Sequence, residues 1–219
     1  MSEEVKELVN VLKRVERKLL FVIYVKAGLA YLLWSIAIAG CILLSVLLFG
    51  LDIIHDPNIE GCIITFYWII MIIVVLSRFS KGVRFIDEIV RMHFNIDFNS
   101  IERKASRKFS KIYGAGWALG IVVGWIIIPI LTNGLYTPVG FLVFLGIGNM
   151  SIYIGILRAY NVSLRMQFIF SSAFFLAGLA TCAIILYKNI DVAWSFAASI
   201  ALLLYIIISF YYISKSMSI

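Results

Sequence analysis

The segment 113–131, with the sequence YGAGWALGIVVGWIIIPIL, decides the class of fold. It holds no Asp, Glu, Lys, Arg or His. As a helix rising ~1.5 Å per residue, it is long enough to cross the ~30 Å hydrocarbon core of a bilayer. The whole chain is 63% hydrophobic, with a mean hydropathy of +1.02. Soluble domains carry roughly 45–50% apolar residues, so the sequence predicts an all-α integral membrane protein.

Five further apolar runs share this character, and none of them contains Asp, Glu, Lys, Arg or His. Lipid cannot satisfy exposed backbone amides, so each run should cross the membrane as a helix. The predicted organisation is an N-terminal arm (1–26), two spans (27–77), a basic loop (78–112) and four spans (113–219). The six transmembrane helices are expected at 27–51, 61–77, 113–131, 138–157, 166–187 and 192–213.

The basic residues predict how these spans are oriented. Of the 19 Lys and Arg residues, all except Lys188 fall in segments that lie on one side of the membrane if the six spans are correct. Loops rich in Lys and Arg stay in the cytoplasm. This rule places both ends of the chain in the cytoplasm, and we expect the protein to lie in the cell membrane. The net charge of +7 then has a topological cause, and no nucleic-acid partner is needed to explain it.

The loop 78–112 is rich in Lys and Arg and is the segment where we expect a partner to bind. Its second half predicts an amphipathic helix, capped by Asn99 with Glu102. Two interpretations stay open, because the helix could lie on the inner leaflet or could dock a cytoplasmic protein. For the second interpretation, the candidate contacts are Ile101 and Phe109 on the apolar face and Arg103 and Arg107 on the basic face.

The N-terminal arm 1–26 shows a similar pattern on a smaller scale. Its apolar residues recur at helical spacing, and basic residues crowd the end next to the first span. We therefore expect a second amphipathic arm on the cytoplasmic side. The apolar positions are Val5, Leu8, Leu12, Val15 and Leu19.

Small residues in the third span predict where helices pack closely. Gly116, Gly120 and Gly124 recur every four residues and would form one stripe on a helix. Such stripes let helix backbones approach each other within lipid. We expect packing within one chain, with a seam between copies of the chain as the alternative.

Asn149 is the most polar residue near the centre of a predicted span. Its amide needs a hydrogen-bond partner in an apolar medium. We expect an interhelical hydrogen bond, and a contact to a substrate or ion is the alternative interpretation.

The sequence argues against catalysis and against a bound cofactor or metal. The predicted spans lack the ionisable groups of proton relays, and His55 and His93 should lie on opposite sides of the membrane. The three cysteines show no metal-binding spacing. Asp52, His55, Asp56 and Glu60 share the first outer loop, where we expect a hydrated connection and where a weak divalent-metal site is the alternative.

In its layout of spans alone, the chain resembles ABC-2-type permeases. The shared features are six spans, inward termini, an amphipathic entry helix and a long basic loop after the second span. The resemblance implies a membrane subunit of a transport assembly, in which residues 78–112 contact an ATPase or another cytoplasmic partner. The alternative is a membrane scaffold or regulatory protein without transport activity.

Overall fold

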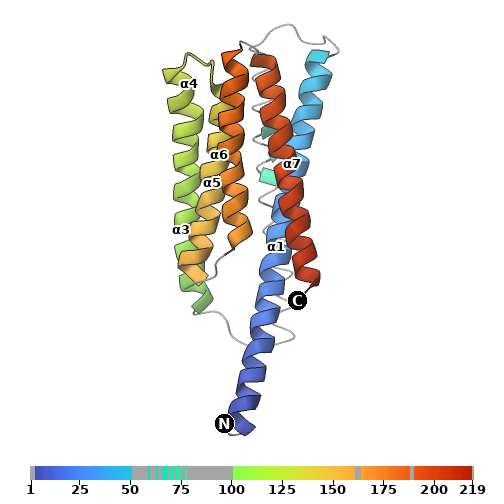
Figure 1. Cartoon of the computed structure of the whole chain (residues 1–219), viewed down its shortest axis with the longest axis vertical. Helices are drawn as coiled ribbons and strands as arrows, with labels where there is room; N and C mark the ends of the chain where they lie inside the picture. The colour runs from blue at the N-terminus through green and yellow to red at the C-terminus, as the bar shows by residue number, and fades with distance from the viewer. Residues whose placement is uncertain are drawn as a thin grey trace. The chain divides into compact units, whose positions relative to one another are not determined.

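The structure is a computed structural model of the 219-residue chain (Figure 1). It describes residues 3–50, 101–160, 164–187 and 190–218, with single helical positions or short groups of them between 59 and 77. Within the helices, some side chains also lie outside the description, among them those of residues 101–106. The predicted loop 78–100 and the predicted outer-loop cluster of Asp52, His55, Asp56 and Glu60 lie outside the described residues.

Helices and turns account for nearly all of the described residues, and no strand occurs among them. Five helical stretches are long and apolar enough to cross a membrane, which confirms the all-α class and is consistent with a multi-pass membrane protein. The predicted span 61–77 is described only at scattered positions, so the count of six stays a prediction. The helices are α1 (Glu3–Gly50), α3 (Ile101–Gly120), η1 (Ile121–Ile127), α4 (Ile128–Leu131), α5 (Thr137–Tyr160), α6 (Arg165–Leu186) and α7 (Ile190–Met217).

The chain divides into two compact units, which we describe separately. Unit 1 comprises Met1–Asn95 and Tyr205–Ile219, and unit 2 comprises Ile96–Leu204. Helix α7 therefore contributes its first half to unit 2 and its second half to unit 1. The first helix of the chain is thus grouped with the end of the last one, a pairing that the sequence pattern does not reveal.

In unit 1, α1 runs antiparallel to the second half of α7. The ring of Tyr24 stacks on Tyr212 at 5.8 Å between centroids, and the ring of Tyr31 lies 5.6 Å from that of Tyr205. Between these pairs, the hydroxyl of Ser209 donates a 2.9 Å hydrogen bond to the backbone carbonyl of Gly28. Lipid provides no hydrophobic drive for helices to associate, so aromatic stacking and an interhelical hydrogen bond supply the attraction between α1 and α7.

In unit 2, α5 packs against both α3 and α6. Phe109 of α3 lies against Gly155 near the end of α5, and Gly120 lies against Phe144 near its middle, so α3 and α5 are antiparallel. Helix α6 also runs antiparallel to α5, since Tyr153 meets Phe168 and the hydrophobic cluster at the other end joins Val139 with Ile185. The start of α7 joins that cluster through Ala193.

The predicted third span forms a continuous helical rod, but its middle is not α-helical. Residues Ile121–Ile127 form a π-helix, in which the backbone N–H of Ile128 donates to the carbonyl of Val123. Pro129 follows directly and has no N–H to give to the carbonyl four residues earlier. The wider π turn lies directly before this missing bond and keeps the rod continuous.

A tight turn joins this rod to α5. Asn133 and Gly134 both have positive φ angles, 49° and 81°, and these are residue types that tolerate the left-handed region. The hydroxyl of Thr132 donates to the carbonyl of Ile128 at 2.7 Å, and the hydroxyl of Thr137 donates to that of Gly134 at 2.6 Å. These bonds close the end of one helix and the start of the next, and they fix the antiparallel pairing above.

Candidate functional site: the basic end of unit 2

Helix α3 separates its side chains into a packed face and an exposed face. Phe109 is half-buried, and a Cβ added to Gly155 of α5 would lie 2.8 Å from its ring. Ile112 is half-buried and reaches the same glycine. In contrast, Arg107 and Lys111 are exposed. The amphipathic pattern predicted for this segment thus corresponds, over these positions, to contact with α5 on one side and open surroundings on the other.

The four predicted partner contacts are therefore not equivalent. Phe109 is engaged inside the unit, where its ring also stacks on Tyr113 at 5.8 Å, and Arg107 is available on the surface. Ile101 and Arg103 belong to the first turn of α3, and their side chains lie outside the description. The exposed Lys108 lies beside Arg107 and extends the basic face.

The predicted stripe of glycines faces α5. A Cβ added to Gly116 would collide with Ser151, one added to Gly120 would lie 3.0 Å from the carbonyl oxygen of Phe144, and one added to Gly124 would meet the backbone of Gly140. These three glycines therefore let α3 and η1 approach α5 within one chain. In the alternative, a second copy of the chain would pack on the glycine face of α3 and η1, but α5 of the same chain already occupies that face.

Asn149 lies fully buried at the seam between α5 and α6. Its Nδ2 donates a 2.8 Å hydrogen bond to the carbonyl of Leu145 in its own helix. Its backbone carbonyl accepts a bond from the Nε2 of Gln167 at 3.3 Å, which links the two helices. Gln167 is 1% exposed. Sequence reasoning missed Gln167, although a lone amide beside an apolar run is a signal of the same kind as Asn149.

Three buried hydroxyls near this seam bond to the preceding turn of their own helix, and one of them also reaches a second helix. The hydroxyl of Ser171 donates to the carbonyl of Gln167 at 2.7 Å, and that of Thr181 donates to Ala177 at 2.8 Å. The hydroxyl of Ser151 donates to the carbonyl of Gly148 at 2.7 Å and also lies 3.5 Å from the carbonyl oxygen of Tyr113 in α3. Bonds to the preceding turn satisfy a hydroxyl without a second helix, so Ser171 and Thr181 serve local structure, whereas Ser151 also links α5 to α3.

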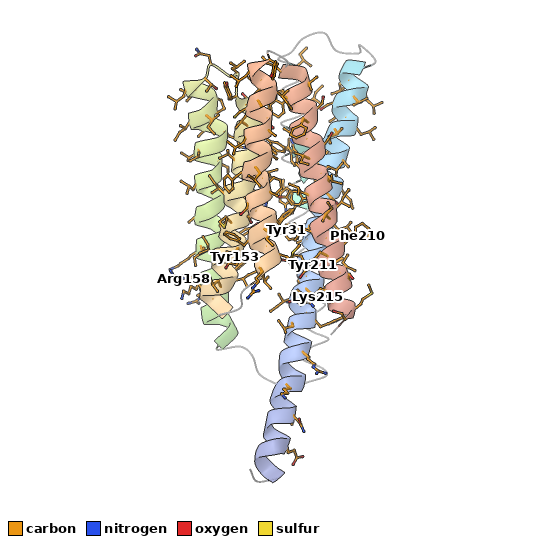
Figure 2. All side chains as sticks on the ribbon, viewed as in Figure 1. Tyr31, Tyr153, Arg158, Phe210, Tyr211 and Lys215 are labelled. Carbon is orange, nitrogen blue, oxygen red and sulfur yellow. The ribbon has the colours of Figure 1, made fainter. Side chains whose placement is uncertain are left out.

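Basic side chains gather at one end of unit 2. Because α3 and α6 are antiparallel to α5, the start of α3, the end of α5 and the start of α6 lie together, and Figure 2 shows Arg158 at that end of α5. None of the side chains that the structure places in unit 2 belongs to Asp or Glu. The positive charge of these basic residues is therefore not balanced by any carboxylate among the side chains that the structure places in unit 2. The exposed residues concerned are Arg107, Lys108, Lys111, Arg158 and Arg165.

This arrangement is suited to electrostatic binding. Arg and Lys at an exposed surface attract carboxylates and phosphates, and Arg offers a planar fork for two hydrogen bonds. Within the residues that the structure describes, no group of three or more His, Cys, Asp or Glu residues is placed to hold a metal ion. The predictions of no cofactor and no catalytic group remain predictions for the chain as a whole.

Comparison with other proteins adds no identification: no protein-family model, no curated protein and no solved structure matches this chain.

Proposed function

We propose that the chain is a non-enzymatic, multi-pass subunit of a transport assembly in the cell membrane. In this proposal, residues 78–112 contact a cytoplasmic partner, and the outward face of α3 provides the contact nearest the membrane. The observation that carries the proposal is the division of α3 into two faces. Arg107 is exposed while Phe109 and Ile112 are held against α5.

That division favours a docking role over a helix that floats on the leaflet. A surface helix binds lipid by burying its apolar face in the interface. Here Phe109 and Ile112 already contact Gly155, and Gly116 and Gly120 continue the contact with α5. A basic face mounted on a fixed helix presents its charges in one geometry, which suits recognition of a protein with matching carboxylates.

The proposal includes six crossings, with both ends of the chain in the cytoplasm. In unit 1, the end of α7 lies beside the first half of α1, because Tyr212 stacks on Tyr24. In this proposal, the rod formed by α3, η1 and α4 and the helices α5, α6 and α7 add four crossings to that of α1. The apolar run 61–77, which holds no Asp, Glu, Lys, Arg or His, would supply the sixth. The positive-inside pattern gives the direction.

A scaffold or regulatory protein without transport is the second candidate, and a specific observation favours it. The contact between η1 and α5 brings the backbones of Gly124 and Gly140 together, and the buried hydroxyls of Ser171 and Thr181 bond within their own helix. Neither feature offers a hydrated path along these helices. In both candidates this chain contributes docking, and they differ in whether its assembly moves a substrate.

Site-specific photo-crosslinking in native membranes tests the docking role. A crosslinking residue at position 107 should capture a soluble protein, whereas one at position 109 should crosslink within the chain, because Phe109 faces α5. The charge reversal Arg107→Glu should abolish co-purification of the captured protein. Lys215→Glu is the matched control, since Lys215 is an exposed basic residue on another helix end. Capture of lipid alone at position 107 would refute the docking role.

The nature of the captured protein separates the two candidates. A partner that hydrolyses ATP, with a rate that changes when this chain binds, supports the transport assembly. A partner that binds with the same dependence on Arg107 but hydrolyses no nucleotide supports the scaffold.

A further inference from the structure

Three helices of unit 2 change from apolar to basic at the same level. In α3, Lys111 comes directly before the apolar run 112–131. In α5, the run 138–157 ends directly before Arg158, and in α6, Arg165 directly precedes the run 166–187. Each run of about 20 residues spans about 30 Å as a helix, which matches the thickness of the hydrocarbon core. The three basic residues therefore fall at the depth of the lipid headgroups.

The fold brings these three positions to one end. Phe109 and Ile112, on either side of Lys111, contact Gly155 of α5, which lies three residues before Arg158. Tyr153 of α5 meets Phe168 of α6, three residues after Arg165. The three basic positions therefore lie at about the same level of the antiparallel helices. Lys111, Arg158 and Arg165 are all exposed there, and no carboxylate is among the side chains that the structure places in unit 2. By contrast, Arg107 lies a further turn of helix away from the apolar run.

An aromatic pair marks the same depth. Tyr153 of α5 and Phe168 of α6 lie 5.6 Å apart, in the turns that adjoin Arg158 and Arg165. Phe168 is 48% exposed, and its neighbour Ile169 is 56% exposed. Aromatic side chains concentrate at the headgroup level of membranes. This surface therefore offers contacts for acyl chains directly beside two cationic groups.

We infer that Lys111, Arg158 and Arg165 form a collar that binds the phosphates of anionic phospholipids. The exposed apolar side chains above the collar, Phe168 and Ile169 among them, contact the acyl chains of the same lipids. The inference does not rest on the proposed function, because lipid binding at these three positions does not depend on whether a protein binds at Arg107. The collar gives the chain a preference for negatively charged lipid and holds these positions of α3, α5 and α6 at the depth of the headgroups.

Native mass spectrometry and thermal unfolding test the collar, with the full chain in nanodiscs. One set of nanodiscs contains phosphatidylcholine alone, and the other adds phosphatidylglycerol. The wild type should retain phosphatidylglycerol preferentially and should unfold at a higher temperature when it is present. In the triple variant Lys111→Gln, Arg158→Gln and Arg165→Gln, retention should fall by roughly five-fold for each neutralised residue. Arg107→Gln is the matched control and should retain the lipid.

Two further comparisons separate lipid binding from the alternatives. A triple variant that keeps the charge, Lys111→Arg, Arg158→Lys and Arg165→Lys, should behave as the wild type, because attraction to a lipid surface is delocalised. If the neutral variant unfolds early in phosphatidylcholine alone, the comparison is made with the three single Gln variants. Soluble glycerol phosphate should not reproduce the stabilisation. Equal retention of the two lipids by wild type, or stabilisation by glycerol phosphate alone, would overturn the inference.

Discussion

The carbonyl oxygen of Gly140 in α5 occupies the space that a Cβ of Gly124 in η1 would need, and the carbonyl oxygen of Gly124 does the same at Gly140. Two backbones thus touch at a pair of glycines. Where two backbones approach this closely, the Cα–H groups of one helix can contact the carbonyl oxygens of the other. These weak attractions are available only where both residues lack a side chain. The pairing holds the π segment against α5.

Adding one methyl group at this contact should separate the two helices. We expect Gly124→Ala and Gly140→Ala each to lower the free energy of unfolding by about 1–3 kcal/mol, the usual cost of overpacking. Thermal unfolding in mild detergent measures the effect. Gly114→Ala in α3 is the matched control, since a Cβ there meets no atom within 4 Å and alanine favours the helix. Equal stability of the three variants would contradict close contact at this pair.

The contact between α1 and α7 should respond to a smaller change. Ser209→Ala removes the hydrogen bond that its hydroxyl donates to the carbonyl of Gly28, and we expect a loss of about 0.6–1.7 kcal/mol. Ser172→Ala is the control, because that hydroxyl bonds only the preceding turn of its own helix among the bonds described. Gly28→Ala should cost more, since its Cβ would lie 2.7 Å from Ile213. Thermal unfolding that ranks Ser172→Ala above Ser209→Ala in cost would oppose this pairing.

Gln167 should hold the start of α6 against α5. Gln167→Leu keeps most of the volume but removes the donor to the carbonyl of Asn149. We expect a loss of about 0.6–1.7 kcal/mol, and faster hydrogen exchange in the first turn of α6. Ser171→Ala, which breaks a bond inside α6 only, should leave the exchange of that turn nearly unchanged. Identical exchange in the two variants would remove the linking role from Gln167.

Phe109 and Arg107 should differ sharply although they lie two positions apart. Phe109→Ala removes a ring packed on Gly155 and Tyr113, and we expect a loss of stability of about 1–3 kcal/mol. Arg107→Gln, at an exposed position, should change stability by less than about 0.5 kcal/mol. Chemical unfolding of the purified protein gives both values. A stable Phe109→Ala variant would mean that this ring faces outward.

Membrane orientation can be measured with single cysteines in a chain that lacks the native Cys41, Cys62 and Cys182. A membrane-impermeant reagent should label Asn133→Cys in intact cells, because that exposed turn lies at the end of unit 2 opposite the basic residues. Ser218→Cys should be labelled only after the membrane is opened. Labelling of Ser218→Cys in intact cells would reverse the proposed orientation.

Hydropathy and glycine spacing account for much of what the sequence could predict. The apolar runs predict the five long helices, because a span is recognised by its length and its apolar composition, and both can be read from the sequence. The spacing of Gly116, Gly120 and Gly124 marks a close-packed face, but a small residue does not specify which helix approaches it. Only the fold identifies α5 as the neighbour.

Other features could not be read from these patterns. The π segment depends on Pro129 and on packing around Gly124, and a search for 3.6-residue periodicity does not look for it. Gln167 lies two positions inside the start of α6, whereas the sequence criterion that identified Asn149 considers polar residues near the centre of a span. The pairing of α1 with α7 joins residues so far apart in sequence that no local pattern can report it.

That pairing also sets the order of events during synthesis. Gly28 and Ser209 are separated by 181 positions, which at roughly 5–20 residues per second means about 10–35 s of translation. Throughout that time α1 is exposed to the membrane without the tyrosines of α7 that will cover Tyr24 and Tyr31. An earlier contact is available further along α1, because the hydroxyl of Tyr67 donates to the carbonyl of Ala37 at 2.7 Å. A chain that stops before Tyr205 would therefore keep that contact but leave the face of α1 around Tyr24 and Tyr31 uncovered.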